Sequence, residues 1–596
     1  MTEKLKKCYG KNEMKWIKLL AAGLFFSAFF AAASLTNPSQ ALAATYTVTK
    51  TADTNDGTCD ADCSLREAIA AANANAGHDT IEFDIPDTDD GYVPASGDAH
   101  AYWSIELLTT LTLSDDDGVF INGYSQAGSQ RNTAPFGETL NTVLKIDLYF
   151  QGGAYFNVNA DKNHITGLSI RSTASNSGTV RLPVAANNWI EGNFFGSNII
   201  GTQSSYSGIV QLQGGADTNI IGTNGDGLED FSEKNLFMGN VTSLAGYINE
   251  YPSARNNVIA GNYIATDRTG DQCTNAIELR YLAIQVNGKN GRIGTDYDGV
   301  SDTEESNIIG CINGGSTGDF RAFVRLSGDI ENYQVNGNFV GISPHGEKLG
   351  SLVGTGTGAL SMAWGSASNI IIKGNTISNA DYGIICANET CINNTFIENK
   401  VFGNELLDID IMVDGENSQV SLNDPGDLDT GPNDLMNYPE IQGAEYLGNG
   451  KYKIWGWLEG NLAEAPFTIE VCKSSGHSSG YGGCLEPLGT MTTSERMWSM
   501  EVTVPGDSKE SLSTFTALAT NANGSTSEFG PNFGGSIPGP GAPAPTPKKP
   551  DLLATHSGFT VKNDVISFAP PATFLWDVYL DVSHTPQTGT RRVSGA

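Results

Sequence analysis

Short apolar runs separated by Gly-Asn pairs dominate the middle of the chain. The pair occurs six times, and its glycines are Gly192, Gly239, Gly261, Gly337, Gly374 and Gly403. The apolar runs hold Val, Ile and Phe over only a few residues, so each needs stacked neighbours above and below to bury its face. Most gaps lie near multiples of about 20 to 29 residues, the range of short solenoid repeats. The pattern predicts a solenoid with coils of about 24 residues; scattered turns in a β-sandwich are the alternative.

One amphipathic helix is predicted ahead of the solenoid. Ser64 and Glu67 form a capping box, and the Ala-rich run that follows stops at Gly77. Alternating residues predict strands on either side, at 44–54 and 79–86. Because a solenoid needs its first coil covered, residues 44–99 are expected to form an N-terminal cap.

The pattern changes beyond residue 440. Longer alternating strands are expected at 451–458, 467–472, 498–504 and 515–520, which predicts a small antiparallel β-sandwich over residues 441–533. Trp455 and Trp457 share one face of the first of these strands; an outward face would stack sugar rings, whereas packing is the favoured interpretation. A Pro-rich linker (534–550) and a C-terminal tail of unknown fold (551–596) follow.

The N-terminus has the features of a signal peptide. Six lysines precede an apolar stretch at 19–35, and Ala41-Leu42-Ala43 is a small-residue cleavage site before Ala44. A retained membrane anchor is the alternative. We expect residues 1–43 to be removed and no helical transmembrane span in the mature chain.

The charge of the chain restricts its partners. The net charge is −33, and removal of residues 1–43 leaves 28 basic and 65 acidic residues, a formal charge of −37. Such a surface repels nucleic acid and anionic lipid, and it attracts divalent cations. We therefore expect no nucleic-acid partner.

Cysteine spacing agrees with export. The mature chain holds eight cysteines in four sequence-local pairs, and this pairing is the most economical of the 105 possible connectivities. The pairs are Cys59 with Cys63, Cys273 with Cys311, Cys386 with Cys391, and Cys472 with Cys484.

Several segments resemble a known family. The run Cys63-Ser64-Leu65-Arg66-Glu67-Ala68, the segment Gly123–Gly128, the stretch from Gly261 and the run 423–432 are similar to segments of the bacterial CSLREA-motif family of secreted β-helix repeat proteins. The resemblance implies an all-β fold, a right-handed parallel β-helix over residues 100–412, on a secreted or cell-surface protein. It implies little about activity.

Two acidic loops repeat 72 residues apart, which is three coils of 24. Each places carboxylates or amides around an Asp-Gly turn, the donor set that Ca²⁺ prefers. A metal-free Asp-Gly turn is the alternative. The candidate ligands are Asn224, Asp226, Asp230 and Glu233 in the first loop, and Asp296, Asp298, Asp302 and Glu305 in the second.

A third acidic segment lies in the predicted joint between solenoid and sandwich, residues 413–440. Asp424, Asp427 and Asp429 would repel one another unless solvated or bridged by a cation. We expect structural Ca²⁺ here or, alternatively, a solvated linker.

Catalytic signals are weak. Asp408 and Asp410 point to the same side of a predicted strand and are the candidates for a carboxylate pair, but no metal-binding His pair or nucleophile motif accompanies them.

The sequence therefore favours a non-enzymatic, calcium-stabilised binding or adhesion module whose partners are extracellular glycans or a neighbouring surface. An extracellular polysaccharide lyase or glycoside hydrolase is the alternative.

Overall fold

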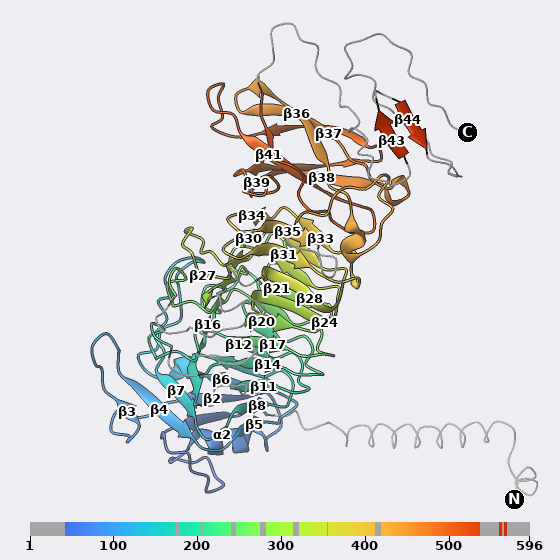
Figure 1. Ribbon diagram of the computed structural model, residues 1–596. Coiled ribbons are helices and arrows are strands. Elements are labelled where there is room, and N and C mark those ends of the chain that lie inside the picture. Colours follow the sequence, from blue (N-terminus) through green and yellow to red (C-terminus); the bar gives the residue numbers. More distant parts are fainter. Residues whose placement is uncertain are drawn as a thin grey trace, which may run out of the picture.

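The computed structural model describes residues 42–173, 179–204, 207–239, 246–273, 282–313, 321–353, 356–411, 419–536, 559–562 and 565–568. The predicted signal peptide, the Pro-rich linker and the C-terminal tail lie almost wholly outside these residues. The described chain is mostly β-structure, and its long body is a column of stacked coils (Figure 1).

Three sheets of parallel strands run along this column, and successive coils add one strand to each. This arrangement is that of a parallel β-helix, as predicted, while its right-handed sense stays a prediction. Sheet 1 contains β1 (Thr45–Val48), β2 (Asp79–Phe83), β6 (Val119–Asn122), β9 (His164–Thr166), β12 (Trp189–Glu191), β15 (Ile220–Gly222), β18 (Val258–Ala260), β21 (Arg292–Gly294), β25 (Gln334–Asn336), β29 (Ile371–Lys373) and β33 (Thr395–Ile397).

Sheet 2 contains β4 (Tyr102–Leu107), β7 (Ile146–Phe150), β10 (Leu168–Ser172), β13 (Phe194–Phe195), β16 (Leu236–Phe237), β19 (Tyr263–Ile264), β22 (Ile308–Ile309), β26 (Phe339–Val340), β30 (Thr376–Ile377) and β34 (Lys400–Val401), with β3 (Tyr92–Val93) antiparallel at its edge. Sheet 3 contains β5 (Leu111–Leu113), β8 (Phe156–Val158), β11 (Val180–Leu182), β14 (Val210–Leu212), β17 (Ile248–Glu250), β20 (Leu282–Val286), β24 (Ala322–Glu331), β28 (Gly358–Ser368), β31 (Tyr382–Cys386) and β35 (Leu407–Ile411). Shorter elements are β23 (Ile312–Asn313), β27 (Gly350–Ser351), β32 (Cys391–Ile392) and the 3-10 helices η1 (Gly123–Ser125), η2 (Pro432–Leu435) and η3 (Leu462–Glu464).

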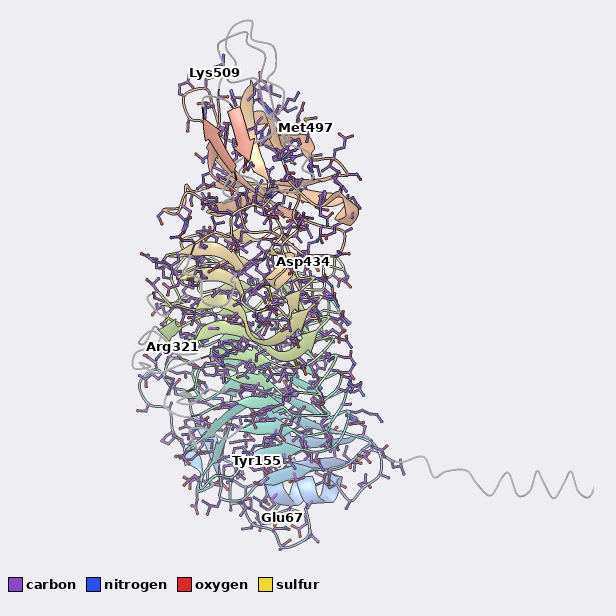
Figure 2. The ribbon with its side chains drawn as sticks, turned by 45° about the vertical axis from the view of Figure 1, so that its right-hand side comes forward. Glu67, Tyr155, Arg321, Asp434, Met497 and Lys509 are labelled. Atoms are coloured by element: carbon purple, nitrogen blue, oxygen red, sulfur yellow. A yellow bond between two sulfur atoms is a disulfide. The ribbon has the colours of Figure 1, made fainter. Side chains whose placement is uncertain are left out.

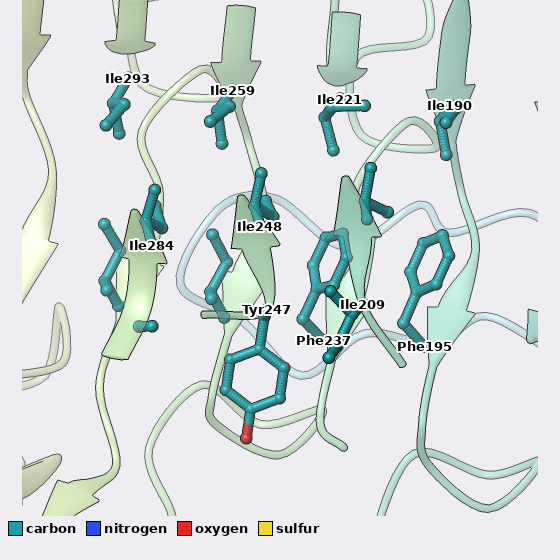
Figure 3. Close-up of a cluster of buried hydrophobic side chains, with 14 of the residues drawn as sticks. Ile190, Phe195, Ile209, Ile221, Phe237, Tyr247, Ile248, Ile259, Ile284 and Ile293 are labelled. Atoms are coloured by element: carbon teal, nitrogen blue, oxygen red, sulfur yellow. The ribbon is translucent and has the colours of Figure 1, made fainter. Parts of the chain in front are cut away.

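The core is a set of side-chain stacks inside the coils. Ile221, Ile259 and Ile293 occupy successive rungs of sheet 1 in register and are fully buried (Figure 3). The rings of Phe195 and Phe237 stack with centroids 4.5 Å apart. Each coil thus buries its short strands only against its neighbours, which is why strands of two to five residues suffice.

Asparagines form a ladder beside this core. The side-chain Nδ2 of each donates to Oδ1 of the next at 2.8 to 3.4 Å. Four of the six Gly-Asn pairs supply Asn193, Asn262, Asn338 and Asn375. The other members are Asn235, Asn307 and Asn399.

The predicted coil length of 24 residues holds for the coil from Ile372 to Phe396 but is wrong for most of the column. Ile221 pairs with Ile259 and Ile259 pairs with Ile293, so the acidic loops are two coils apart, of 38 and 34 residues, and not three. Only the short strands are constrained by stacking. The loops between them vary in length because they lie at the surface, where insertions disturb no rung.

The N-terminal end is covered as the sequence predicts. Helix α2 (Leu65–Ala72) begins at Ser64 with a complete capping box, in which Glu67 accepts from the Ser64 amide at 2.7 Å. Figure 2 shows Glu67 at the end of the column opposite Met497 and Lys509. Strands β1 and β2 lie in sheet 1 itself, so the segment before residue 100 contributes rungs as well as the cap.

The β-sandwich covers the other end. Antiparallel strands β36 (Glu440–Gly448), β37 (Lys451–Trp457) and β40 (Met497–Thr503) face β38 (Phe467–Ser474), β39 (Cys484–Thr493), β41 (Thr514–Thr520) and β42 (Phe533–Gly534) across a core of apolar side chains. The second set continues sheet 2, since β39 pairs with β34. Trp455 is buried and Trp457 half-buried, which supports packing over an outward aromatic face.

The cysteines are joined in the four sequence-local pairs, with disulfides Cys59–Cys63, Cys273–Cys311, Cys386–Cys391 and Cys472–Cys484. Four disulfides are typical of an extracellular environment. Within the described residues, no helix is long and apolar enough to cross a membrane. A separate hairpin, β43 (Phe559–Lys562) and β44 (Val565–Phe568), belongs to the tail.

Candidate ligand-binding cavity and acidic loops

An open cavity of about 440 Å³ lies on sheet 3, where β24 and β28 are the longest strands of the column. Its volume falls in the range of small-molecule sites. Its lining residues are Gln285, Asn287, Arg325, Ser327, Gly328, Trp364 and Gly365.

Paired glycines shape this cavity. Gly328 and Gly365 face each other in register, just beyond an irregularity in the pairing of the two strands, and both have positive φ. A Cβ atom on Gly365 would lie 2.3 Å from the carbonyl oxygen of Gly328. Only glycine fits this close approach, so the backbone itself forms part of the cavity wall.

The lining combines an aromatic surface with polar groups that suit hydroxyl-rich ligands. Trp364 is 46% exposed, which is unusual for an indole. The Arg325 guanidinium is buried at the wall, and burial lowers its pKa to about 10, so it stays cationic at neutral pH. With the amides of Gln285 and Asn287, these groups offer a stacking surface together with hydrogen-bond donors and acceptors.

The two acidic loops have the same internal hydrogen bonds. Thr223 donates to Asp230 at 2.9 Å in the first loop, and Thr295 donates to Asp302 at 2.9 Å in the second. Backbone amides donate to Glu233 and Glu305 in equivalent positions, both at 3.1 Å. The sequence repeat is therefore a structural repeat, and the same hydrogen bonds shape both turns.

The loops also contact each other across the coils. Lys234 forms a buried ion pair with Glu304, and Ser301 donates to Asp230. Burial raises the pKa of Glu233 to about 8, with the charge of Glu191 adding to the effect.

The two loops differ in how they suit a cation. Oxygens of Asp296, Asp302 and Glu305 lie within 4.8 Å of one another, but the Arg292 guanidinium already contacts Glu305 at 2.7 Å and Asp296 at 3.6 Å. In the first loop Asn224 donates to Asp226 at 3.1 Å. The described carboxylates of this first loop form no group of three as close as that of the second loop. Asp298 caps its own turn by accepting from the Val300 amide at 2.7 Å.

The joint fits a cation better. Oxygens of Asp424, Asp427 and Asp429 lie within 4.8 Å of one another. Burial, followed by the charge of Asp424, raises the pKa of Asp429 to about 6, and burial raises that of Asp427 to about 7. No Lys, Arg or His forms an ion pair with the three in the described part of the chain.

Asp408 and Asp410 lie on the same side of β35, but beneath the sandwich, where each is 2% exposed. Asp408 accepts from Asn404 at 2.9 Å and from the Gly483 amide. Asp410 instead forms a carboxyl pair with Glu528 of the sandwich. Neither side chain lines the cavity on sheet 3.

Sequence reasoning missed the cavity residues. The cavity depends on neighbours from three coils whose spacing the loops obscure. A Trp flanked by Gly in the run GALSMAWGSAS was the available signal, because glycine beside an aromatic in a strand marks a bulge or a close approach.

Comparisons with known proteins do not show a family for this chain. No protein-family model matches the chain, and no curated protein is similar to it. Among solved structures, the chain is similar to the enzymatically active domain of tailspike protein 2 of bacteriophage CBA120, at 8% identity, with 73% of this chain and 72% of that chain covered and a TM-score of 0.21. The full-length tailspike protein 2, described as from an Escherichia coli O157:H7 bacteriophage, matches at 8% identity over 73% of this chain and 64% of that one, with a TM-score of 0.22.

Proposed function

We propose that this chain is an exported, non-enzymatic protein that binds extracellular glycans in the cavity on sheet 3. The observation that carries the proposal is the composition of the cavity wall: an exposed indole, an arginine, two amides, a hydroxyl and two glycines. Aromatic faces stack against the apolar faces of sugar rings, while amides and guanidinium groups pair with hydroxyls or carboxylates.

The absence of an acidic residue among the lining residues favours binding over hydrolysis. Glycoside hydrolases use two carboxylic groups flanking the scissile bond, and the candidate pair Asp408 and Asp410 is buried under the sandwich. A polysaccharide lyase or glycosidase stays the alternative, because Arg325 could serve a lyase as its cationic group.

A glycan array followed by titration with the retained polymers tests the proposal. Trp364→Ala should weaken binding at least tenfold, whereas Tyr297→Ala, which removes an equally exposed aromatic on the acidic loops, should not. Uronic-acid polymers incubated with the protein, with and without Ca²⁺, should be recovered intact. Release of unsaturated or reducing ends would contradict the binding function and favour the enzyme.

We further propose that Ca²⁺ stabilises the protein at the joint, through Asp424, Asp427 and Asp429. A ligand that binds the folded state alone raises stability by mass action. Millimolar Ca²⁺ should therefore raise the unfolding temperature of the wild type and leave that of Asp427→Asn unchanged. The exposed Asp329→Asn serves as the control and should keep the full response; a wild type indifferent to Ca²⁺ and to chelator would rule the site out.

A further inference from the structure

Strand β1 begins beside a buried carboxylate. The backbone N–H of Ala44 donates to Asp79 Oδ1 at 2.7 Å, and Asn75 donates to the same oxygen at 2.8 Å. Asp79 is 0% exposed, and its second oxygen, Oδ2, has no hydrogen-bond partner. A buried oxygen without a hydrogen bond carries a desolvation cost. A hydrogen-bond donor to Asp79 Oδ2 would therefore stabilise this end of the column.

More negative charge gathers at the same place. Gly77 donates to Asp117 at 2.9 Å, and the Asp117 amide donates to Asp115 Oδ1 at 3.1 Å. Asp115 is also buried, and its Oδ2 is without a partner. Burial, and then the charges of Asp117, Asp79 and Asp116, raise the pKa of Asp115.

In the described part of the chain these carboxylates have no ion-pair partner, and the nearby Lys162 ammonium group donates only to the backbone carbonyl of Asp116, at 3.5 Å. Among the described residues, no Lys, Arg or His forms an ion pair with Asp79 or with Asp115, Asp116 and Asp117. A buried, hydrogen-bonded carboxylate without a counter-charge is costly, so a cation at Ala44 would lower the free energy of the fold.

The predicted signal-peptidase site lies at this position. Hydrolysis breaks the C–N bond between Ala43 and Ala44; the hydroxyl of water stays on the new Ala43 carboxyl group, and its hydrogen goes to the Ala44 nitrogen. That amine then takes a proton from solvent, because the pKa of an α-amino group is about 7.7 to 8.0. One peptide N–H donor becomes a cationic group with three donors.

We propose that cleavage before Ala44 creates an α-ammonium group that pairs with buried Asp79, supplies the donor that Asp79 Oδ2 lacks and offsets the negative charge of the nearby Asp115. The ion pair fastens β1 to β2, since Thr80 already donates to the Ala44 carbonyl at 2.8 Å. Export processing thereby completes the first rung of the column. This proposal is independent of what the cavity on sheet 3 binds.

Two full-length chains test it: the processed protein that begins at Ala44, and the same chain with Leu42 and Ala43 retained. Both added residues are exposed, Leu42 by 82%, so the extension fits without a clash. Besides the charge at Ala44 it changes one hydrogen bond, that from Asn75 to the Leu42 carbonyl at 3.0 Å, so Asn75→Ala in both chains controls for that contact. Hydrogen exchange of the amides of β1 should be roughly tenfold to a hundredfold faster in the extended chain, the range for loss of a charged hydrogen bond.

Variants separate the ion pair from other effects. Asp79→Asn should speed exchange of β1 in the processed chain and change it much less in the extended chain, so the two changes should be non-additive. Asp84→Asn changes an exposed acid just after β2, the strand that begins at Asp79, and it should leave the exchange of the β1 amides unchanged in both chains. Equal exchange in the processed and extended chains, or a mature N-terminus found by mass spectrometry at another residue, would overturn the proposal.

Discussion

At the residue scale, the asparagine ladder is the feature on which the column most depends. Asn307 accepts from the Asn262 amide at 2.9 Å and donates to the Ile259 carbonyl at 2.9 Å and to Asn338 at 2.8 Å. It is fully buried. Each coil thus satisfies backbone groups at a corner where no strand pairing is available.

Asn307→Leu should destabilise the protein by about 3 kcal/mol or more, because it keeps the size of the side chain but leaves a buried amide and a buried carbonyl unpaired. Denaturant unfolding measures the change. The exposed Asn523→Leu should cost less than about 0.5 kcal/mol. Comparable stabilities for the two variants would show that the ladder follows from stacking and contributes little to it.

The sequence revealed this ladder only in part. Gly192, Gly261, Gly337 and Gly374 have positive φ and mark the corner that each Asn follows. Asn235, Asn307 and Asn399 reach the same corner after Lys, Ser and Glu, so the dipeptide pattern cannot identify them. The hydrogen bonds require the amide, whereas the preceding backbone conformation varies with the loop before it.

At the element scale, the cavity depends on the bend of β24 and β28. Two strands of sheet 3 extend well beyond the length of their neighbours, and Gly328 and Gly365 allow them to bend together. The strands themselves follow from apolar runs in the sequence. The cavity does not, because it requires Gln285 in register with Arg325, and Trp364 brought near them by the irregular pairing beyond Arg325, over coils of unequal length.

Gly365→Ala should destabilise the protein by more than about 2 kcal/mol and weaken glycan binding, because the new Cβ would meet the Gly328 carbonyl at 2.3 Å. Gly356→Ala is the matched control: this glycine also has positive φ, but nothing lies within 4 Å of the added Cβ. It should cost only about 1 to 2 kcal/mol, the penalty for the left-handed backbone alone. Thermal unfolding and titration of the two variants separate the steric contribution from the conformational one.

At the scale of the whole molecule, both ends of the column are covered, by α2 at one end and by the sandwich at the other. The sequence predicted the first cover from its capping box, because that signal is local. It did not predict the second, since the contacts join distant segments: Thr395 donates to the Gly524 carbonyl at 2.9 Å, and the Glu398 amide donates to Glu470 at 2.7 Å. Asn433 of the joint bonds both Asn394 of the last coil and Thr526 of the sandwich, each at 2.8 Å.

The interface between the last coil and the sandwich is rich in buried carboxyl groups. Burial raises the pKa of Asp408 to about 6, those of Asp410 and Glu470 to about 7, and that of Glu528 well above its usual range. The Glu528 carboxylate accepts from the amides of Ile411 at 2.9 Å and Ser421 at 2.7 Å. Asp410 and Glu528 share one proton, because two ionised carboxylates would repel in this buried place, and Glu528 holds it more strongly, since its pKa is raised further. His477, Tyr438, Tyr481 and Glu398 are further titratable groups that face this cluster.

These raised pKa values set the direction of the pH dependence. Between about pH 4, the ordinary value of a free carboxyl group, and pH 7, the folded chain keeps protons that the unfolded chain releases. The stability from the interface is fully present below that window and falls as pH rises through it. The unfolding free energy of the sandwich and last coil should thus be higher at pH 5 than at pH 8, with Asp410 accounting for up to about 2.5 kcal/mol of that difference.

Asp410→Asn tests the role of this group, because the amide stays neutral at every pH and can pair with Glu528 either by accepting from its carboxyl group or by donating to its carboxylate. The variant should lose much of the difference in stability between pH 5 and pH 8 and gain stability over the wild type at pH 8, as measured by chemical denaturation at each pH. The exposed Asp329→Asn should keep the wild-type profile. An Asp410→Asn profile as steep as that of the wild type would assign the dependence to Glu528, Asp408, Glu470 or the joint. In that case Asp408→Asn and Glu470→Gln are the variants that divide it further.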